Sequence, residues 1–204
     1  MNAKNQLQAL ILAGLLIAQG CAGLSVGQDV QSGRNALQTG RSNDAVGYLT
    51  RAAAQDPNYT LPYRIREGVL TYLGRAYYET GRDADARAAL EKALARDQDD
   101  HLARLYLGLT LVRIGERERG TKELQNGLRG VHEQLDYLAS DSFSGIFWDP
   151  NRMIRNDIKT ALAQTSASPE VIAAAQRIGS LVDLEIDVAR RNEVRLRYEP
   201  MVDS

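Results

Sequence analysis

Two stretches in the middle of the chain share one spacing of glycines and small apolar residues. They are LGRAYYETGRDADARAALEKALARD at 73–97 and LGLTLVRIGERERGTKELQNGLRGV at 107–131, and they begin 34 residues apart. A period of this length indicates a unit of two packed helices. Such a unit cannot bury its apolar face alone, so copies of it stack on one another.

One more copy precedes these two and is the first of the three along the chain. It reads GRNALQTGRSNDAVGYLTRAAAQDP at 33–57, and Ala45 lies 41 residues before the equivalent Ala86. That distance exceeds the period by seven residues, and the excess falls in PNYTLPYRIRE, where Pro57 and Pro62 favour a local break. We expect three repeats over roughly residues 26 to 134, within an array that extends over 26–139.

The residues at the repeated positions resemble those of the tetratricopeptide repeat. The second copy has Leu73, Gly74, Tyr77, Gly81, Ala86, Leu90 and Ala93, and the third has Leu107, Gly108, Leu111, Gly115, Gly120, Leu124 and Gly127. The resemblance implies an all-α fold: a right-handed solenoid of helical hairpins with about three repeats and a C-terminal helical cap. The alternative is an ordinary helical bundle, which is also all-α because apolar residues recur at helical spacing.

The N-terminal residues follow the pattern of a secretory signal peptide. Lys4 precedes an apolar core from Ala9 to Ala18, which is too short to span a bilayer. The tetrapeptide IAQG before Cys21 resembles the lipobox of bacterial lipoproteins. The resemblance implies a signal peptide at 1–20 and a lipidated Cys21 with a short tether at 21–25. Ala22 then favours the periplasmic face of the outer membrane. The alternative is a buried N-terminal helix.

The composition argues against nucleic-acid binding and against an internal disulfide bond. The formal net charge is -1, so no overall field attracts nucleic acid, and we expect no nucleic-acid partner. Cys21 is the single cysteine, so the chain has no internal disulfide and packing must hold the fold.

The resemblance to tetratricopeptide repeats also implies a concave face, formed by the first helix of each repeat, that binds a protein partner. The candidate groove residues are Arg34, Gln38, Thr71, Arg75, Tyr78 and Arg113. In the third repeat, Leu105, Leu109 and Val112 make this face apolar, although the other side of the same helix is apolar too. Such a helix is normally buried all round, so we expect later parts of the chain to cover it.

The stretch FSGIFWDPNR at 143–152 holds both phenylalanines and the single tryptophan. A solenoid needs an end cap, so we expect Phe143, Ile146, Phe147 and Trp148 to plug the last repeat. The alternative is an exposed knob for a partner, with Phe143, Phe147 and Trp148 as hot-spot candidates.

Two helix-start signals follow and divide residues 140–204 into an aromatic loop and capping helices. Asp149 with Pro150 predicts one N-cap and first helical position, and Ser168 with Pro169 predicts another. On the last helix, Asp183, Asp187, Arg190 and Arg191 lie on one side, which we expect to face solvent.

The sequence offers few candidate catalytic residues. No nucleophile and acid can be assigned to act with His101 or His132 in a catalytic set. The acidic run DQDDH at 97–101 is more typical of a helix N-cap than of a metal site. We expect no enzyme, no cofactor and no metal.

The favoured function is a scaffold or adaptor for protein partners in envelope assembly, secretion or pilus biogenesis. In plan it is similar to the tetratricopeptide pilotins of type IV pili and to lipoprotein adaptors that recruit peptidoglycan hydrolases. The alternative is a periplasmic module that binds a lipid or glycan fragment in a hydrophobic pocket.

Overall fold

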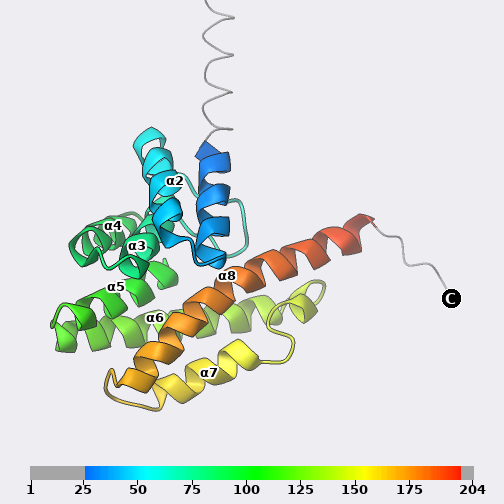
Figure 1. Ribbon diagram of the computed structural model, residues 1–204. Coiled ribbons are helices and arrows are strands. Elements are labelled where there is room, and N and C mark those ends of the chain that lie inside the picture. Colours follow the sequence, from blue (N-terminus) through cyan, green and yellow to red (C-terminus); the bar gives the residue numbers. More distant parts are fainter. Residues whose placement is uncertain (1–25, 199–204) are drawn as a thin grey trace, which may run out of the picture.

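The structure is a computed structural model that describes residues 26–198, and its regular elements are helices (Figure 1). In chain order they are a helix at 26–38, α2 (Ser42–Gln55), α3 (Val69–Glu79), α4 (Asp83–Arg96), α5 (His101–Arg113), α6 (Arg117–Ala139), the 3-10 turn η1 (Gly145–Phe147), α7 (Met153–Leu162) and α8 (Pro169–Tyr198). The predicted signal peptide and Cys21 lie outside the described residues. Within 26–198, no helix is both long and apolar enough to cross a membrane.

Three helical hairpins follow one another, and each turns at an equivalent glycine. Gly40, Gly81 and Gly115 have φ angles of 72°, 74° and 94°, in the left-handed region that a side chain disfavours. The residue after each glycine donates its N–H to a carbonyl five positions back, as Arg82 does to Tyr77 (2.9 Å). The repeated glycines of the sequence therefore end the first helix of each repeat.

A second set of equivalent glycines lets the two helices of each hairpin approach closely. A Cβ placed on Gly33 would lie 2.5 Å from Leu49 Cγ, and one on Gly74 would lie 2.4 Å from Leu90 Cγ. Each contact thus pairs a glycine in the first helix with a leucine in the second, and the two pairs have the same spacing along the chain.

The third hairpin brings its two backbones closest. A Cβ on Gly108 would lie 2.4 Å from the backbone nitrogen of Leu124, and one on Gly127 would lie 2.6 Å from that of Leu105. Gly127 stands where the second repeat has Ala93, so the glycine at this position has a packing role.

The seven extra residues of the first repeat form a loop and not a helical extension. The loop covers residues 56–68, and an antiparallel bridge joins Thr60 in its first half to Gly68 at its end. Leu61 and Ile65 are buried, so the loop is anchored to the core by its own side chains.

The C-terminal helices pack on the array. α7 lies against α6 and α8, and α8 also packs on α5. Ser168 caps α8 as predicted, because its hydroxyl accepts the N–H of Val171 (3.3 Å). The prediction for α7 was wrong in one respect: the helix begins at Met153, not at Pro150.

The late start of α7 has a local cause. Asp149 and Arg152 both have positive φ angles, 45° and 56°, so the chain makes a turn before the helix begins. The carboxylate of Asp149 still caps the helix, because its two oxygens accept the N–H groups of Ile154 and Arg155 at 3.0 Å each.

Candidate protein-interaction site

The first helices of the three repeats share one concave face, and α8 lies on it (Figure 1). The strongest contact on this face joins Arg34, in the helix at 26–38, to Asp183 of α8. The guanidinium nitrogens Nε and Nη2 of Arg34 donate to Asp183 Oδ1 at 3.0 and 2.6 Å. Both side chains are at most 1% exposed, so the pair is withdrawn from solvent.

Asp187 lies one turn further along α8 and extends this contact. Arg34 Nη1 donates to Asp187 Oδ1 at 3.1 Å, and Gln38 Nε2 donates to Asp187 Oδ2 at 2.9 Å. Residues four apart lie on one face of a helix. Asp183 and Asp187 therefore present both carboxylates to the first repeat.

The second repeat contacts α8 in a similar way. Arg75 of α3 donates to Asp183 Oδ2 at 3.3 Å and to Glu79 Oε1 at 2.7 Å. Tyr78, one turn later, accepts a hydrogen bond from Gln176 of α8 at 2.6 Å. Both side chains are buried.

Two candidate groove residues have other roles. Thr71 is buried and donates its hydroxyl to Asp100, the N-cap residue of α5. Arg113 stacks 3.5 Å over the ring of Tyr78 and pairs with Asp83 at 3.0 Å. These contacts join the second repeat to the third.

The expectation of an open concave groove was therefore wrong. Arg34, Gln38, Arg75 and Tyr78 do bind a helix, but that helix is the chain's own α8. The prediction that Asp183 faces solvent was wrong for the same reason, since its charge is matched by two buried arginines.

The apolar third repeat is covered as expected. Leu105, Leu109 and Val112 are all buried, and α8 packs on α5. Gly179 marks the close approach, because a Cβ there would lie 2.5 Å from the hydroxyl oxygen of Tyr106. The apolar stripe of α8, which includes Ile178, Val182 and Ile186, is buried too. We conclude that α8 is part of the core.

The family comparison agrees with this geometry. Residues 36–109, from within the first described helix into α5, match the family model of the tetratricopeptide repeat. This part of the chain consists of tetratricopeptide repeats. No curated protein and no solved structure matches the chain.

A buried acid lies beside the contact between the tetratricopeptide array and α8. Glu67, at the end of the loop over 56–68, is buried, and its Oε1 has no hydrogen-bond partner within the described residues. Burial, followed by the negative charge of Asp183, raises the pKa of Glu67 to about 8. Sequence patterns did not indicate this residue, because an acid in a polar loop is ordinarily exposed.

The aromatic loop divides into a buried part and an exposed part. Trp148 is 1% exposed and donates its indole N–H to Glu193 of α8 at 3.0 Å. Phe147 is partly buried against the core. Phe143 and Ile146 are 61% and 71% exposed. The predicted plug therefore holds for Trp148 and is wrong for Phe143 and Ile146.

Polar contacts hold the exposed part of the aromatic loop in place. Asp141 accepts the N–H groups of Phe143 and Ser144 at 3.0 and 2.8 Å, and these bonds lower its pKa to about 2. Arg64, from the loop over 56–68, donates to the hydroxyl of Ser144 and pairs with Asp141 at 3.3 Å. The loop inserted after the first repeat thus holds the aromatic loop that follows the third repeat in place.

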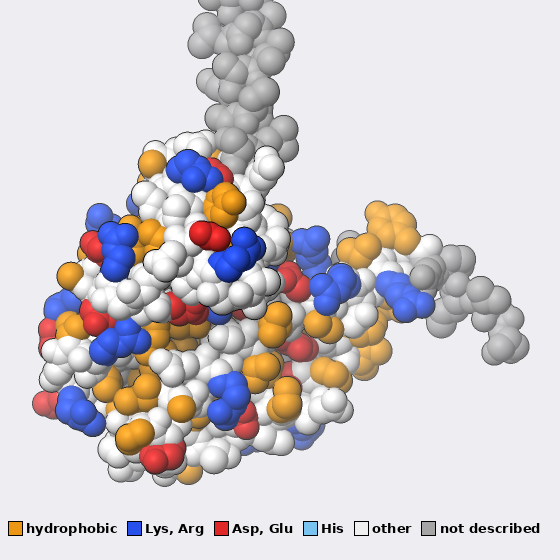
Figure 2. Space-filling view, viewed as in Figure 1, with side chains coloured by type: hydrophobic (Ala, Val, Ile, Leu, Met, Phe, Trp, Pro, Cys, Tyr) orange, Lys and Arg blue, Asp and Glu red, His pale blue; other side chains and the backbone are white. Residues whose placement is uncertain are grey.

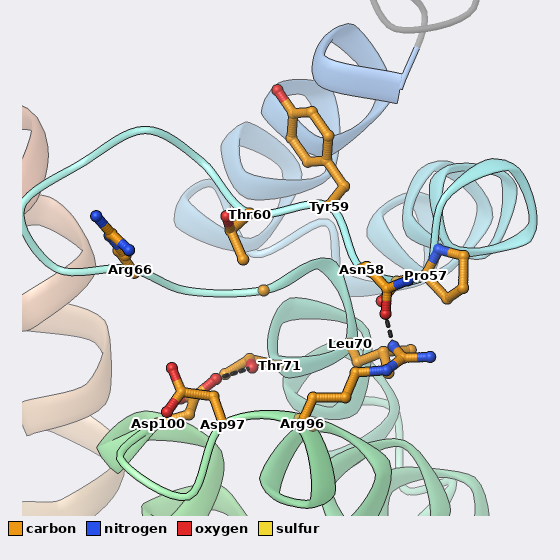
Figure 3. A pocket seen from close by; sticks show the side chains of 12 residues that line it. Pro57, Asn58, Tyr59, Thr60, Arg66, Leu70, Thr71, Arg96, Asp97 and Asp100 are labelled. Carbon is orange, nitrogen blue, oxygen red and sulfur yellow. Dashed lines mark hydrogen bonds between the residues drawn. The ribbon is translucent and has the colours of Figure 1, made fainter.

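A cavity of about 200 Å³ lies beneath the loop over 56–68 (Figure 3). Tyr59 and Arg66 line it from the loop, and Thr71 and Asp100 line the opposite side. The Asp100 carboxylate is occupied by Thr71 and by the N–H of Ala103 (2.8 Å), and burial raises its pKa to about 6. Asp100 caps α5, as we expected for the acidic run DQDDH.

No group of three or more His, Cys, Asp or Glu side chains within 26–198 is arranged to hold a metal ion. His132 lies 3.2 Å from Asp136 on the same helix, one turn away. The histidine side chain is mostly buried, at 16% exposed, whereas the aspartate is about half exposed.

Proposed function

We propose that this chain is a non-catalytic, lipid-anchored scaffold that binds a protein partner at the periplasmic face of the bacterial outer membrane. The tetratricopeptide match is the observation that carries the proposal, because such repeats generally mediate contacts between proteins. Envelope assembly, secretion and pilus biogenesis are the processes in which we place it.

The sequence before the first described helix supports the anchor. Cys21 follows IAQG, and four residues separate it from Val26, the first described residue. An extended residue spans at most about 3.6 Å, so the tether reaches no further than about 18 Å. A lipidated Cys21 would hold the first repeat close to the membrane surface.

The position of α8 bears on where a partner binds. Because α8 fills the concave face with buried apolar and charged side chains, the partner surface lies elsewhere on the molecule. The exposed apolar side chains of the C-terminal region are one surface that this arrangement leaves available.

The alternative was a pocket for a lipid or glycan fragment between the aromatic loop and the third repeat. Leu105, Leu109 and Val112 are instead packed in the core, and Trp148 is buried beside α8. We therefore favour the scaffold.

The test uses the tagged full-length chain and its Cys21→Ser variant in the native envelope. Labelling with an alkyne fatty acid should mark the wild-type chain and leave the variant unlabelled. Crosslinking, followed by mass spectrometry, should recover a defined envelope protein with the wild-type chain only. Equal labelling of both chains would contradict the anchor, and recovery of no protein partner would contradict the scaffold.

A further inference from the structure

The exposed large apolar side chains are concentrated in the C-terminal part of the described chain. Figure 2 shows hydrophobic side chains gathered over α7, α8 and the loop that precedes α7. Between residues 26 and 136, Ile114 is the one large hydrophobic residue that is exposed. From residue 137 onward the exposed set is Tyr137, Phe143, Ile146, Met153, Leu184, Val188, Val194 and Tyr198.

Part of this set lines a groove between the start of α7 and the middle of α8. The α7–α8 groove encloses about 190 Å³, and its apolar lining is Pro150, Met153, Ile154, Leu181, Leu184 and Val188. Met153, Leu184 and Val188 are 55%, 47% and 40% exposed. The α8 residues are spaced by three and four positions, so they form one continuous stripe on the solvent side of the helix.

The charged residues that line the α7–α8 groove are all acidic. Its charged lining residues are Asp149 and Glu185, and Asp149 is paired with Arg155 at 3.0 Å. Glu185 accepts the N–H of Asp149 at 2.6 Å, and no cation within the described residues lies within ion-pair distance of it. Partial burial raises the pKa of Glu185, so a cation beside it would have an electrostatic gain. The groove thus joins an apolar stripe to a carboxylate that lacks a counter-charge.

The walls of the α7–α8 groove are held in place before any partner arrives. Arg155 of α7 donates to Asp149 and also to Asp136 of α6 at 2.9 Å. A preformed surface loses little conformational entropy on binding, which favours affinity.

We propose that the α7–α8 groove binds an amphipathic helix of a partner protein, with a lysine or arginine of that helix opposite Glu185. Apolar side chains three and four positions apart on the partner would contact Met153, Leu184 and Val188. The proposal deepens the scaffold function and rests on it. Two other occupants fit less well. An anionic lipid surface would be repelled by Glu185. A two-fold contact with a second copy of the chain would bring two Glu185 carboxylates together.

The experiment measures the binding of two synthetic helical peptides by fluorescence anisotropy. Both carry the same leucine face, and they differ in having lysines or glutamates beside it. The full-length protein and its Cys21→Ser variant are each purified in mild detergent, and nanodiscs of zwitterionic lipid without protein provide a lipid background. We expect the lysine peptide to bind at least tenfold more tightly than the glutamate peptide.

Three variants locate the site. Leu184→Gln should weaken binding of the lysine peptide at least tenfold. Glu185→Gln should retain binding but remove the preference for lysine. Val194→Gln changes an equally exposed residue on α8 outside the groove lining and should leave binding unchanged.

Several outcomes would overturn the proposal. Unchanged affinity in Leu184→Gln would place the peptide elsewhere, and equal binding to empty nanodiscs would identify a lipid effect. Absence of binding at millimolar peptide, or a dimer that Leu184→Gln abolishes, would also reject it. Peptide binding does not depend on Cys21, so failure here and failure of the anchored scaffold are distinguishable.

Discussion

Arg34 and Asp183, which are 149 positions apart in the chain, form a buried ion pair with a nitrogen–oxygen distance of 2.6 Å. This pair joins the first helix of the array to α8. It therefore decides that the concave face of the repeats is filled from within the molecule.

Removing one member of the pair should be costly. In Asp183→Asn, Arg34 keeps its charge and loses its main counter-charge in a buried site, which typically costs about 3–5 kcal/mol of unfolding free energy. Urea unfolding followed by circular dichroism measures this loss. Asp85→Asn is the control, because its pair with Arg82 is half exposed and should contribute less than about 1 kcal/mol. Similar losses in the two variants would contradict a structural role for the buried pair.

Glu67 should make stability depend on pH. Its pKa rises from 4.5 to about 8 on folding, so the folded protein holds a proton there that the unfolded chain releases above about pH 4.5. Stability is therefore lost as pH rises from about 4.5 to about 8, by on the order of 1 kcal/mol per pH unit.

The Glu67→Gln variant lacks this titration. Its stability relative to wild type should increase steadily between pH 5 and pH 8 in urea unfolding. A constant difference across this range would show that Glu67 is ionised in the folded protein.

Trp148 and Phe143 should behave differently although they are five residues apart. Trp148→Ala removes a fully buried side chain, and such changes cost about 3–5 kcal/mol. Phe143→Ala alters a mostly exposed side chain and should change stability by about 0.5 kcal/mol or less. Thermal unfolding by circular dichroism compares them, and a larger loss from Phe143→Ala would contradict the division of the loop into a plug and an exposed part.

Two glycine-to-alanine changes test the close helix packing of the third repeat. In Gly127→Ala the new Cβ would lie 2.6 Å from the backbone nitrogen of Leu105, so the helices must separate, at a cost of about 1–3 kcal/mol. Gly47 of α2 has no neighbouring atom within 4 Å, so Gly47→Ala should stabilise the protein by about 0.5–1 kcal/mol. Differential scanning calorimetry should show opposite shifts in Tm. Shifts of the same sign would reject the backbone contact.

Sequence alone determined the repeated part of this protein, because the information there is local. Gly81 and Gly115 recur with the period since each ends a helix in a conformation that glycine adopts at little cost. Gly74 and Leu90 recur because one helix must approach another within the same hairpin. The cap of α8 by Ser168 was predictable for the same reason, since the contact spans three residues.

The tertiary structure alone decided where α8 lies and which aromatic residues are buried. Asp183 and Asp187 have the spacing of a solvent-facing stripe, and nothing near them in sequence reveals that Arg34 and Arg75 are their partners. Phe143 and Trp148 are equally suited to a core, but only Trp148 lies where Glu193 of α8 receives its N–H. The periodicity of a helix shows which residues share a face, but the side chains that meet that face come from segments that are 45 to 149 positions away in these contacts, and only folding brings them together.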